Sequence, residues 1–221
     1  MKVKGSLLKQ EAELEASKDE IATFFDGVIP EFVRDGGGIL SDTVKFWRFK
    51  NALRIVTNSK KLIVDSGLAK KEVPLKVLLP ILENSTLEEV EQMQDKWSNL
   101  LANAITGAKD ISPNYAEILK ELSPLEVGLL DKIFEEIKDK TYEERKNVQF
   151  AKKKICEMFK LSSEQADLII ENLYRLNLFQ APAGHGIAVG EYKFALRTTE
   201  IFEFTTLGFK FVEACKFETL N

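Results

Sequence analysis

The side chains best suited to acid–base or metal chemistry are scarce in this chain. His185 is its only histidine, in the segment AGHGIAVG, and its two cysteines, Cys156 and Cys215, lie far apart in the sequence. A histidine that acts as a general base needs a nucleophile and an orienting acid nearby, and a zinc site needs several ligands at short spacing. Neither set is visible, so we expect no catalytic residue, no metal site and no cofactor.

Other chemistry is equally hard to find. The segment around His185 is rich in glycine but lacks the lysine and the serine or threonine of a phosphate-binding loop, so we identify no small-molecule ligand. Pairs of carboxylates are common on helix surfaces, and an unrecognised nuclease or nucleotidyl site made of acids stays open. We interpret both cysteines as reduced, buried packing residues, with a disulfide between them as the less favoured alternative.

The clearest charge feature is a basic stretch between Asp42 and Asp65, which holds six lysines and arginines and no acid. A helix is predicted from Ser41 or Asp42 to Ser66. One side of that helix carries the candidate contacts for an anionic partner, namely Trp47, Lys50, Arg54 and Lys61. The partner would be a nucleic-acid backbone, a membrane surface or an acidic protein. The alternative, which we favour, is a solvated or inter-helix face that meets an acidic first helix.

A second candidate basic patch is the run Lys152-Lys153-Lys154. It precedes a helix predicted over 164–177, which would be the recognition helix of a DNA-binding module. The side chains expected to point outward from that helix are Gln165, Asp167, Leu168, Glu171, Asn172 and Arg175. Two carboxylates and one arginine form a poor surface for phosphates, so protein contact or a structural role is favoured over DNA reading.

The strongest helical pattern spans Thr86 to Ile105, and we expect the rest of the chain to pack around it. An apolar stripe recurs there in steps of three and four, formed by Val90, Met93, Trp97, Leu100, Leu101 and Ala104. Ser85 and Glu88 are expected to form a capping box, and Gly107 to end the helix. Acids on the opposite face, among them Glu91 and Asp95, are expected to stay in solvent.

Three domains are predicted along the chain. Residues 1–40 would form an acidic N-terminal helix and a glycine hinge at Gly36–Gly38, and residues 41–122 a compact helical bundle. Residues 123–221 follow a winged-helix-like plan. The fold class is therefore mainly α, an N-terminal helical bundle followed by a winged-helix-like domain with a small β-hairpin.

Local signals set the elements of that last domain. Ser123 and Glu126 predict a capping box at the start of a helix, and Ser162 and Gln165 predict another. Residues 139–146 are expected to form a loop and residues 148–159 a helix. Strands are expected over 192–196 and 200–204, and Thr205 or Thr206 should cap a final helix.

Composition and charge bound the class of protein. The net charge is −4 and 44% of the residues are hydrophobic, values typical of a globular protein without the basic excess of a general nucleic-acid binder. No apolar run is long enough for a transmembrane helix, and the N-terminus does not read as a secretion signal. We expect a cytoplasmic protein.

Several blocks together resemble one family. They are VKFWRFKNALRIV, PLKVLLPILENS, LEEVEQMQDKWSNLLANAI, YAEILKELSPLEVGLLDKI, IIENLYRLNLF and FTTLGFKFVEAC. In these blocks, which cover about residues 28–216, the chain resembles the bacterial Abi-alpha (abortive infection alpha) family. The resemblance implies a bacterial cytosolic protein associated with phage defence, and it carries over no catalytic residues.

Two functions remain. The first is a non-enzymatic interaction protein of phage defence that acts through a protein partner or self-association. The second is a nucleic-acid-binding regulator that uses the basic face of helix 41–66 or the winged-helix module. Binding to a membrane surface is a third, less favoured possibility.

Overall fold

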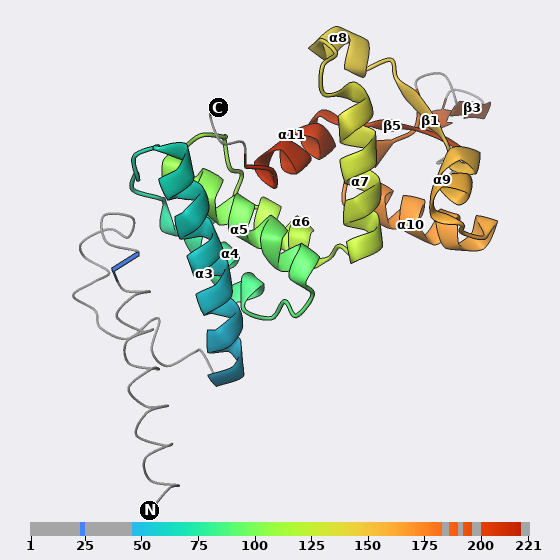
Figure 1. Cartoon of the computed structure of the whole chain (residues 1–221). Helices are drawn as coiled ribbons and strands as arrows, with labels where there is room; N and C mark the ends of the chain where they lie inside the picture. The colour runs from blue at the N-terminus through green and yellow to red at the C-terminus, as the bar shows by residue number, and fades with distance from the viewer. Residues whose placement is uncertain (1–22, 25–45, 183–185, 190–191, 196–199, 218–221) are drawn as a thin grey trace, which may run out of the picture. The chain divides into compact units, whose positions relative to one another are not determined.

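The computed structural model describes residues 23–24, 46–182, 186–189, 192–195 and 200–217 (Figure 1). The predicted N-terminal helix and the hinge Gly36–Gly38 therefore lie outside the described residues, apart from the short piece at Thr23 and Phe24. The chain divides into two compact units, unit 1 with Met1–Glu121 and Ala214–Asn221 and unit 2 with Leu122–Glu213. The three predicted domains, 1–40, 41–122 and 123–221, stay a prediction.

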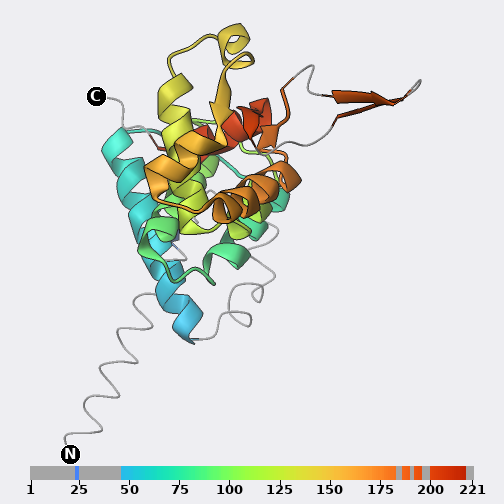
Figure 2. The same ribbon diagram turned by 90° about the vertical axis from the view of Figure 1, so that its right-hand side faces the viewer.

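Unit 1 is built from helices in its described part. They are α3 (Phe46–Ser66), α4 (Leu75–Ser85), α5 (Glu91–Thr106) and α6 (Tyr115–Lys120). Helix α5 packs against both α3 and α4, and α4 also packs against α6. Figure 2, turned by a quarter, shows α3 alongside the helices of this unit. The start predicted for α3 at 41–42 lies outside the described residues, and Gly67, with φ of 67°, ends the helix as expected.

Helix α5 is the centre of unit 1, as its pattern predicts. Trp97 is 1% exposed, and Met93, Leu100 and Leu101 are equally buried. Gly107 ends the helix in the left-handed conformation, with φ of 64°, which glycine adopts at no steric cost.

The predicted start of this helix is wrong. Ser85 ends α4, and Val90 is the N-cap of α5 and is exposed rather than buried. The Glu88 carboxylate accepts a hydrogen bond from the Val90 amide at 2.9 Å, so it stabilises the linking turn instead of reaching back to Ser85. A carboxylate three residues after a serine is not a capping box when the preceding helix uses that serine as its last residue.

Unit 2 combines short helices and strands. Its elements are α7 (Pro124–Ile137), α8 (Tyr142–Arg145), β1 (Gln149–Ala151), α9 (Lys152–Phe159), α10 (Ser163–Arg175), β2 (Phe179–Gln180), β3 (Gly186–Val189), β4 (Tyr192–Ala195), β5 (Ile201–Phe204) and α11 (Thr206–Ala214). The described chain is thus mainly helical with a small antiparallel sheet, which confirms the predicted fold class at that level. The winged-helix assignment itself stays a prediction.

The cap signals in this half are confirmed. Ser123 and Glu126 form a capping box in which the Ser123 amide donates to Glu126 Oε2 at 2.7 Å, and Ser162 and Gln165 form a second one. Thr205 Oγ1 accepts from the amide of Gly208 at 2.9 Å at the start of α11. A Cβ on Gly208 would lie 2.3 Å from the Phe204 ring and 2.6 Å from the Leu178 carbonyl, so only glycine fits there.

Two predictions between the caps are wrong. Residues 139–146 are not simply a loop, because Thr141 and Glu144 form a capping box that starts α8. The helix predicted over 148–159 begins at Lys152, after strand β1. Phe150 is buried between two exposed neighbours, which is the alternation of a strand, and its ring lies 5.8 Å from that of Phe202.

The strands form two separate sheets. The three-stranded sheet has the order β1-β5-β2, with Phe150 opposite Phe202 and Phe179 opposite Phe204. Strand β4 pairs with β3 in a two-stranded ribbon, so the segments expected over 192–196 and 200–204 belong to different sheets. Strand β5 joins distant partners because its phenylalanines are buried with those of β1 and β2. This is a long-range effect that local sequence patterns do not show.

None of the helices described here is long and apolar enough to cross a membrane.

Candidate functional site

The basic face predicted on α3 is partly neutralised within unit 1. The Arg54 guanidinium forms an ion pair with Glu91 of α5, and Asn58 Nδ2 lies 3.5 Å from Asp95 Oδ1. Glu91 and Asp95 of α5 are exposed, as expected, and they also meet α3. Lys61 is exposed, while Trp47 and Lys50 lie in the first turns of α3 and their side chains are outside the described residues.

The seam between α3 and α5 continues inward through uncharged polar groups. Gln94 Nε2 donates to the Glu88 carbonyl at 2.8 Å and to Asn51 Oδ1 at 3.3 Å. Ser59, fully buried, donates to the Ser98 carbonyl at 2.9 Å. A buried polar group is costly without a partner, so these bonds fix how α3 packs on α5 rather than forming a binding site.

The three lysines of the second basic patch each lie near a carboxylate. Lys152 is buried and pairs with Asp167 at 3.0 Å and with Glu200. Lys154 Nζ lies 2.6 Å from Glu136 Oε2, and exposed Lys153 lies 3.9 Å from Glu157. The run is consecutive in sequence, but the helix sends its members to different neighbours.

The surroundings of Lys152 favour its charged form. Hydrogen bonds from its ammonium group to Glu200 and then to Asp167 raise the pKa of Lys152 above its ordinary value of 10.5. Since Asp167 lies on α10 and Glu200 directly precedes β5, this lysine links three parts of unit 2. Its role is to hold the unit together, because a side chain that is 10% exposed offers little to a phosphate.

Some of the side chains expected to point outward from α10 instead serve unit 2 itself. Asp167 binds Lys152, Gln165 completes the capping box, and Asn172 Nδ2 donates to Glu126 Oε1 of α7 at 2.7 Å. Arg175 donates to Asn172 Oδ1, also at 2.7 Å. Leu168 and Glu171 remain, with Glu164 one turn before Leu168, and all three are exposed. This is an acidic surface around an apolar centre.

A set of contacts that the sequence did not reveal connects α5 to the chain end. Asn103 Nδ2 donates to the carbonyls of Ala214 and Lys216, both at 2.8 Å, and Asn99 Nδ2 donates to the Cys215 carbonyl at 3.1 Å. The signal available in the sequence was Asn103 itself, an amide placed in the apolar block LLANA. Carbonyls at the end of a helix lack partners within it, so the two asparagines supply them.

Two buried polar atoms on α5 have no hydrogen-bond partner. They are Trp97 Nε1 and Asn103 Oδ1. A buried indole N–H usually has a hydrogen-bond partner, so this helix carries an energetic cost in its centre that its packing must offset.

The residues with intrinsic reactivity do not assemble. Cys156 and Cys215 are free thiols, and the expectation that both are buried is wrong for Cys156, which is half-buried. His185 lies outside the described residues. Across the described ranges, no three His, Cys, Asp or Glu side chains gather where they could hold a metal ion.

Comparison with known proteins places the chain. A model of the family described as abortive infection alpha matches residues 48–215, which is more than half of the sequence. The chain belongs to this family. The match reaches into both units and begins at Arg48, later than the motif-based resemblance, which started at about residue 28. No curated protein and no solved structure matches the chain.

Proposed function

We propose that this member of the abortive infection alpha family is a non-enzymatic protein of bacterial phage defence that acts in the cytoplasm through protein contacts. Membership of the family suggests the role in abortive infection. The mode of action is inferred from surfaces, because Arg54, Lys152 and Lys154 of the two predicted basic patches pair with carboxylates of the chain itself.

One observation carries the proposal. The exposed surface of α10 presents Glu164, Leu168 and Glu171, with Leu168 64% exposed between the two acids. Phosphates would be repelled by this surface, whereas a partner with basic and apolar side chains would complement it. The lysines that precede it in sequence do not reverse its sign, because Lys152 and Lys154 are already paired with carboxylates.

We further infer that unit 2 is a winged-helix-like module used for protein contact. From α7 to β5 its elements follow the order helix, strand, helix, helix, strand, ribbon, strand, if the short α8 is set aside. The sheet order β1-β5-β2 and the ribbon β3–β4 fit that plan. In this assignment α10 takes the place of a recognition helix, and its acidic surface favours a protein over DNA.

The test is a phage challenge of cells with and without the gene, in which plaques and infected-cell survival are scored together. We expect fewer plaques together with early death of infected cells. The variant Leu168→Asp should lose this protection while its unfolding temperature stays unchanged, since the site is on the surface. Unchanged plating across a broad phage panel would overturn the role, and a hydrolytic activity lost on changing one or two carboxylates would overturn the non-enzymatic mode.

The second candidate is a nucleic-acid-binding regulator, and the observation that favours it is exposed Lys61 on the same helix as Trp47 and Lys50. It predicts binding whose affinity falls about tenfold per tenfold rise in salt for each phosphate contact. Lys50→Glu together with Lys61→Glu should then abolish retention without loss of helicity. Absence of binding at low salt would reject this candidate.

A further inference from the structure

The two most exposed large apolar side chains of the described residues are Val64, 70% exposed, and Leu168, 64% exposed. They lie on different units, Val64 on α3 and Leu168 on α10. A single exposed apolar side chain needs no explanation. What distinguishes these two is the charge of the residues around each.

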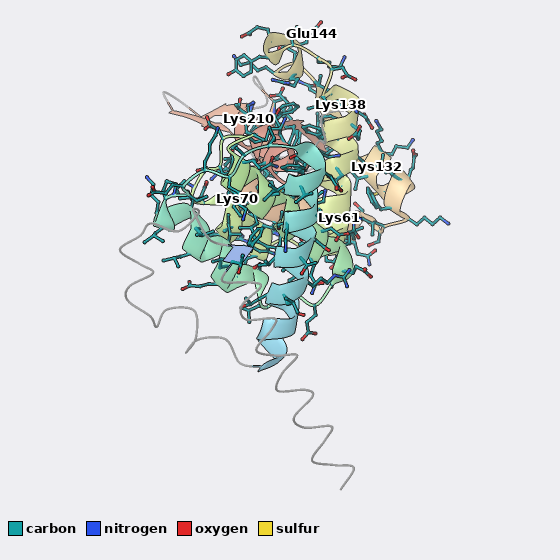
Figure 3. All side chains as sticks on the ribbon, turned by 60° about the vertical axis from the view of Figure 1, so that its left-hand side comes forward. Lys61, Lys70, Lys132, Lys138, Glu144 and Lys210 are labelled. Atoms are coloured by element: carbon teal, nitrogen blue, oxygen red, sulfur yellow. The ribbon has the colours of Figure 1, made fainter. Side chains whose placement is uncertain are left out.

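Val64 is flanked by cations. Lys60 and Lys61 precede it by four and three residues, the spacings that place helical side chains on one face. Both lysines are exposed, and Figure 3 labels Lys61 on α3. Asp65 follows Val64 directly but projects about 100° further round the helix. We call Lys60, Lys61 and Val64 the cationic ridge.

Leu168 is flanked by anions at the same spacings. Glu164 precedes it by four residues and Glu171 follows it by three, and we call these three residues the acidic ridge. Within the part of the chain that the structure describes, neither glutamate makes an ion pair. The basic side chains of the neighbouring helix α9 have other partners, since Lys152 contacts Asp167 and Glu200 and Lys154 contacts Glu136.

We propose that the acidic ridge of one copy of this chain docks on the cationic ridge of a second copy. The two ridges complement each other in charge, and each brings one exposed apolar side chain to the centre of the contact. The inference rests on the proposed function, because it names a second copy as a protein partner of the α10 surface.

The geometry of such a contact sets the form of the assembly. The two ridges are different surfaces of one molecule, so a single contact leaves one ridge of each kind available. A second contact can close two copies into a reciprocal two-fold pair, and repeated contacts give a ring or an open chain of copies. One copy supplies α3 and the next supplies α10 at every junction.

The contact is small, and its size determines how strongly the copies associate. Two ridges of three residues bury far less than the roughly 800 Å² per partner of a stable interface. Exposed charges are screened beyond about 8 Å at physiological ionic strength. Self-association is therefore weak, favoured by low salt and by a high local concentration of the protein.

The experiment measures self-association of the full chain by sedimentation velocity at rising concentration, at low and at high salt. Lys61→Glu makes the cationic ridge less basic, and Glu164→Lys with Glu171→Lys reverses the acidic ridge. Each variant alone should need at least about tenfold more protein to associate, since Lys61→Glu removes the charge complementarity and the double reversal makes like charges face each other. High salt should weaken the association of the wild-type protein in the same direction.

Mixing the two variants provides the decisive measurement. In the mixture, the α3 that carries Lys61→Glu meets a basic α10 at one kind of junction, and the unchanged ridges meet at the other. Association should therefore return to within about threefold of wild type, as expected when complementary charges are restored. Lys132→Glu, a charge reversal on the exposed face of α7 (Figure 3), is the matched control and should associate like wild type.

The proposal is overturned if the wild-type chain is monomeric at every concentration, if the ridge variants associate like wild type, or if the mixture fails to restore association. It is also overturned if Lys61→Glu abolishes binding to nucleic acid but leaves self-association unchanged. A Lys61→Glu variant that has lost association but still protects cells against phage would show that self-association is not the contact used in defence, and it would leave the proposed function standing. Lack of protection by the wild-type gene would reject the proposed function, whatever the association.

Discussion

Helices α5 and α10 look alike in sequence and behave differently in the structure. Each carries an apolar stripe opposite a face with acids, and each begins after a serine that invites a capping box. In α5 that face is used inside unit 1, where Glu91 pairs with Arg54 and Asn103 holds the chain end. In α10 the acids Glu164 and Glu171 stay on the surface around Leu168.

The difference shows that the role of a charged helix face is set by what packs on it. Helix α5 is covered by both α3 and α4, so even its polar side chains become internal contacts. Helix α10 packs against α9 and β2, and its Glu164, Leu168 and Glu171 stay exposed. The surface that we propose for a partner therefore lies on the helix whose exposed acids make no ion pair among the described residues, not on the one with the stronger pattern.

The largest expected difference in stability between α5 and α10 is at the residue in the middle of each helix. Trp97→Ala should destabilise unit 1 by about 3–5 kcal/mol, because a large buried ring leaves a cavity. Leu168→Ala should change the free energy of unfolding by no more than about 0.5 kcal/mol, since its side chain is on the surface. Urea unfolding followed by circular dichroism measures both. Equal losses would contradict the contrast between a covered and an open helix.

The asparagine contacts of α5 give the next largest effect. Asn103→Ala leaves the carbonyls of Ala214 and Lys216 without their donor and should cost about 1–3 kcal/mol, whereas Asn99→Ala, which removes one bond, should cost about 0.5–1.5 kcal/mol. Asn114, which makes no cap bond at the start of α6, is the control, and Asn114→Ala should be near neutral. A loss at Asn114 as large as at Asn103 would show that the contacts to the chain end add nothing.

The variant Lys152→Met tests whether the ion pairs of Lys152 stabilise unit 2. Its pKa is raised in the folded state by Glu200 and Asp167, so its stabilising effect is complete below the unfolded value of about 10.5 and is lost as pH rises through the folded pKa. The stability difference between wild type and Lys152→Met should therefore shrink above pH 10.5. Denaturant unfolding at a series of alkaline pH values measures it. Lys153→Met should show no such trend, and a constant difference for Lys152→Met would rule out the ion pairs as its cause.

The smallest effect is expected at the exposed edge of the α3–α5 seam. A double-mutant cycle of Arg54→Ala and Glu91→Ala should give a coupling free energy of about 0.2–1 kcal/mol, falling with salt, since both side chains are partly exposed. Lys61→Ala combined with Glu91→Ala should be additive, because no ion pair joins them. A coupling free energy near zero between Arg54 and Glu91 would mean that Arg54 is available to bind an anionic partner.

Local signals in the sequence predicted much of the fold. The boxes at Ser123 and Ser162, the cap at Thr205 and the end at Gly107 depend on residues within a single turn, so sequence spacing is enough to find them. The capping box predicted at Ser85 is wrong because this serine is the last residue of the preceding helix, α4. The box at Thr141 has the same form, and its place in a short charged segment led us to expect a loop.

The candidate surfaces were harder to foresee. The basic residues Arg54, Lys152 and Lys154 are visible in the sequence, but their carboxylate partners are not. Those partners lie 15 or more residues away in sequence, on other elements of the fold. The hydrogen bonds of Asn103 reach across more than a hundred residues. The periodic spacing of residues along the sequence cannot predict contacts over such distances.

By itself, the sequence determined the mainly helical fold class, most helix starts, the buried stripe of α5 and the family. Each of these depends on residue type and on spacing within a few turns. Only the tertiary structure decided that β5 joins β1 and β2, that the acids of α5 meet α3, and that Glu164 and Glu171 of α10 make no ion pair within the described residues. Long-range packing made those choices, because burial of distant apolar groups and the pairing of polar groups inside the protein outweigh any local preference.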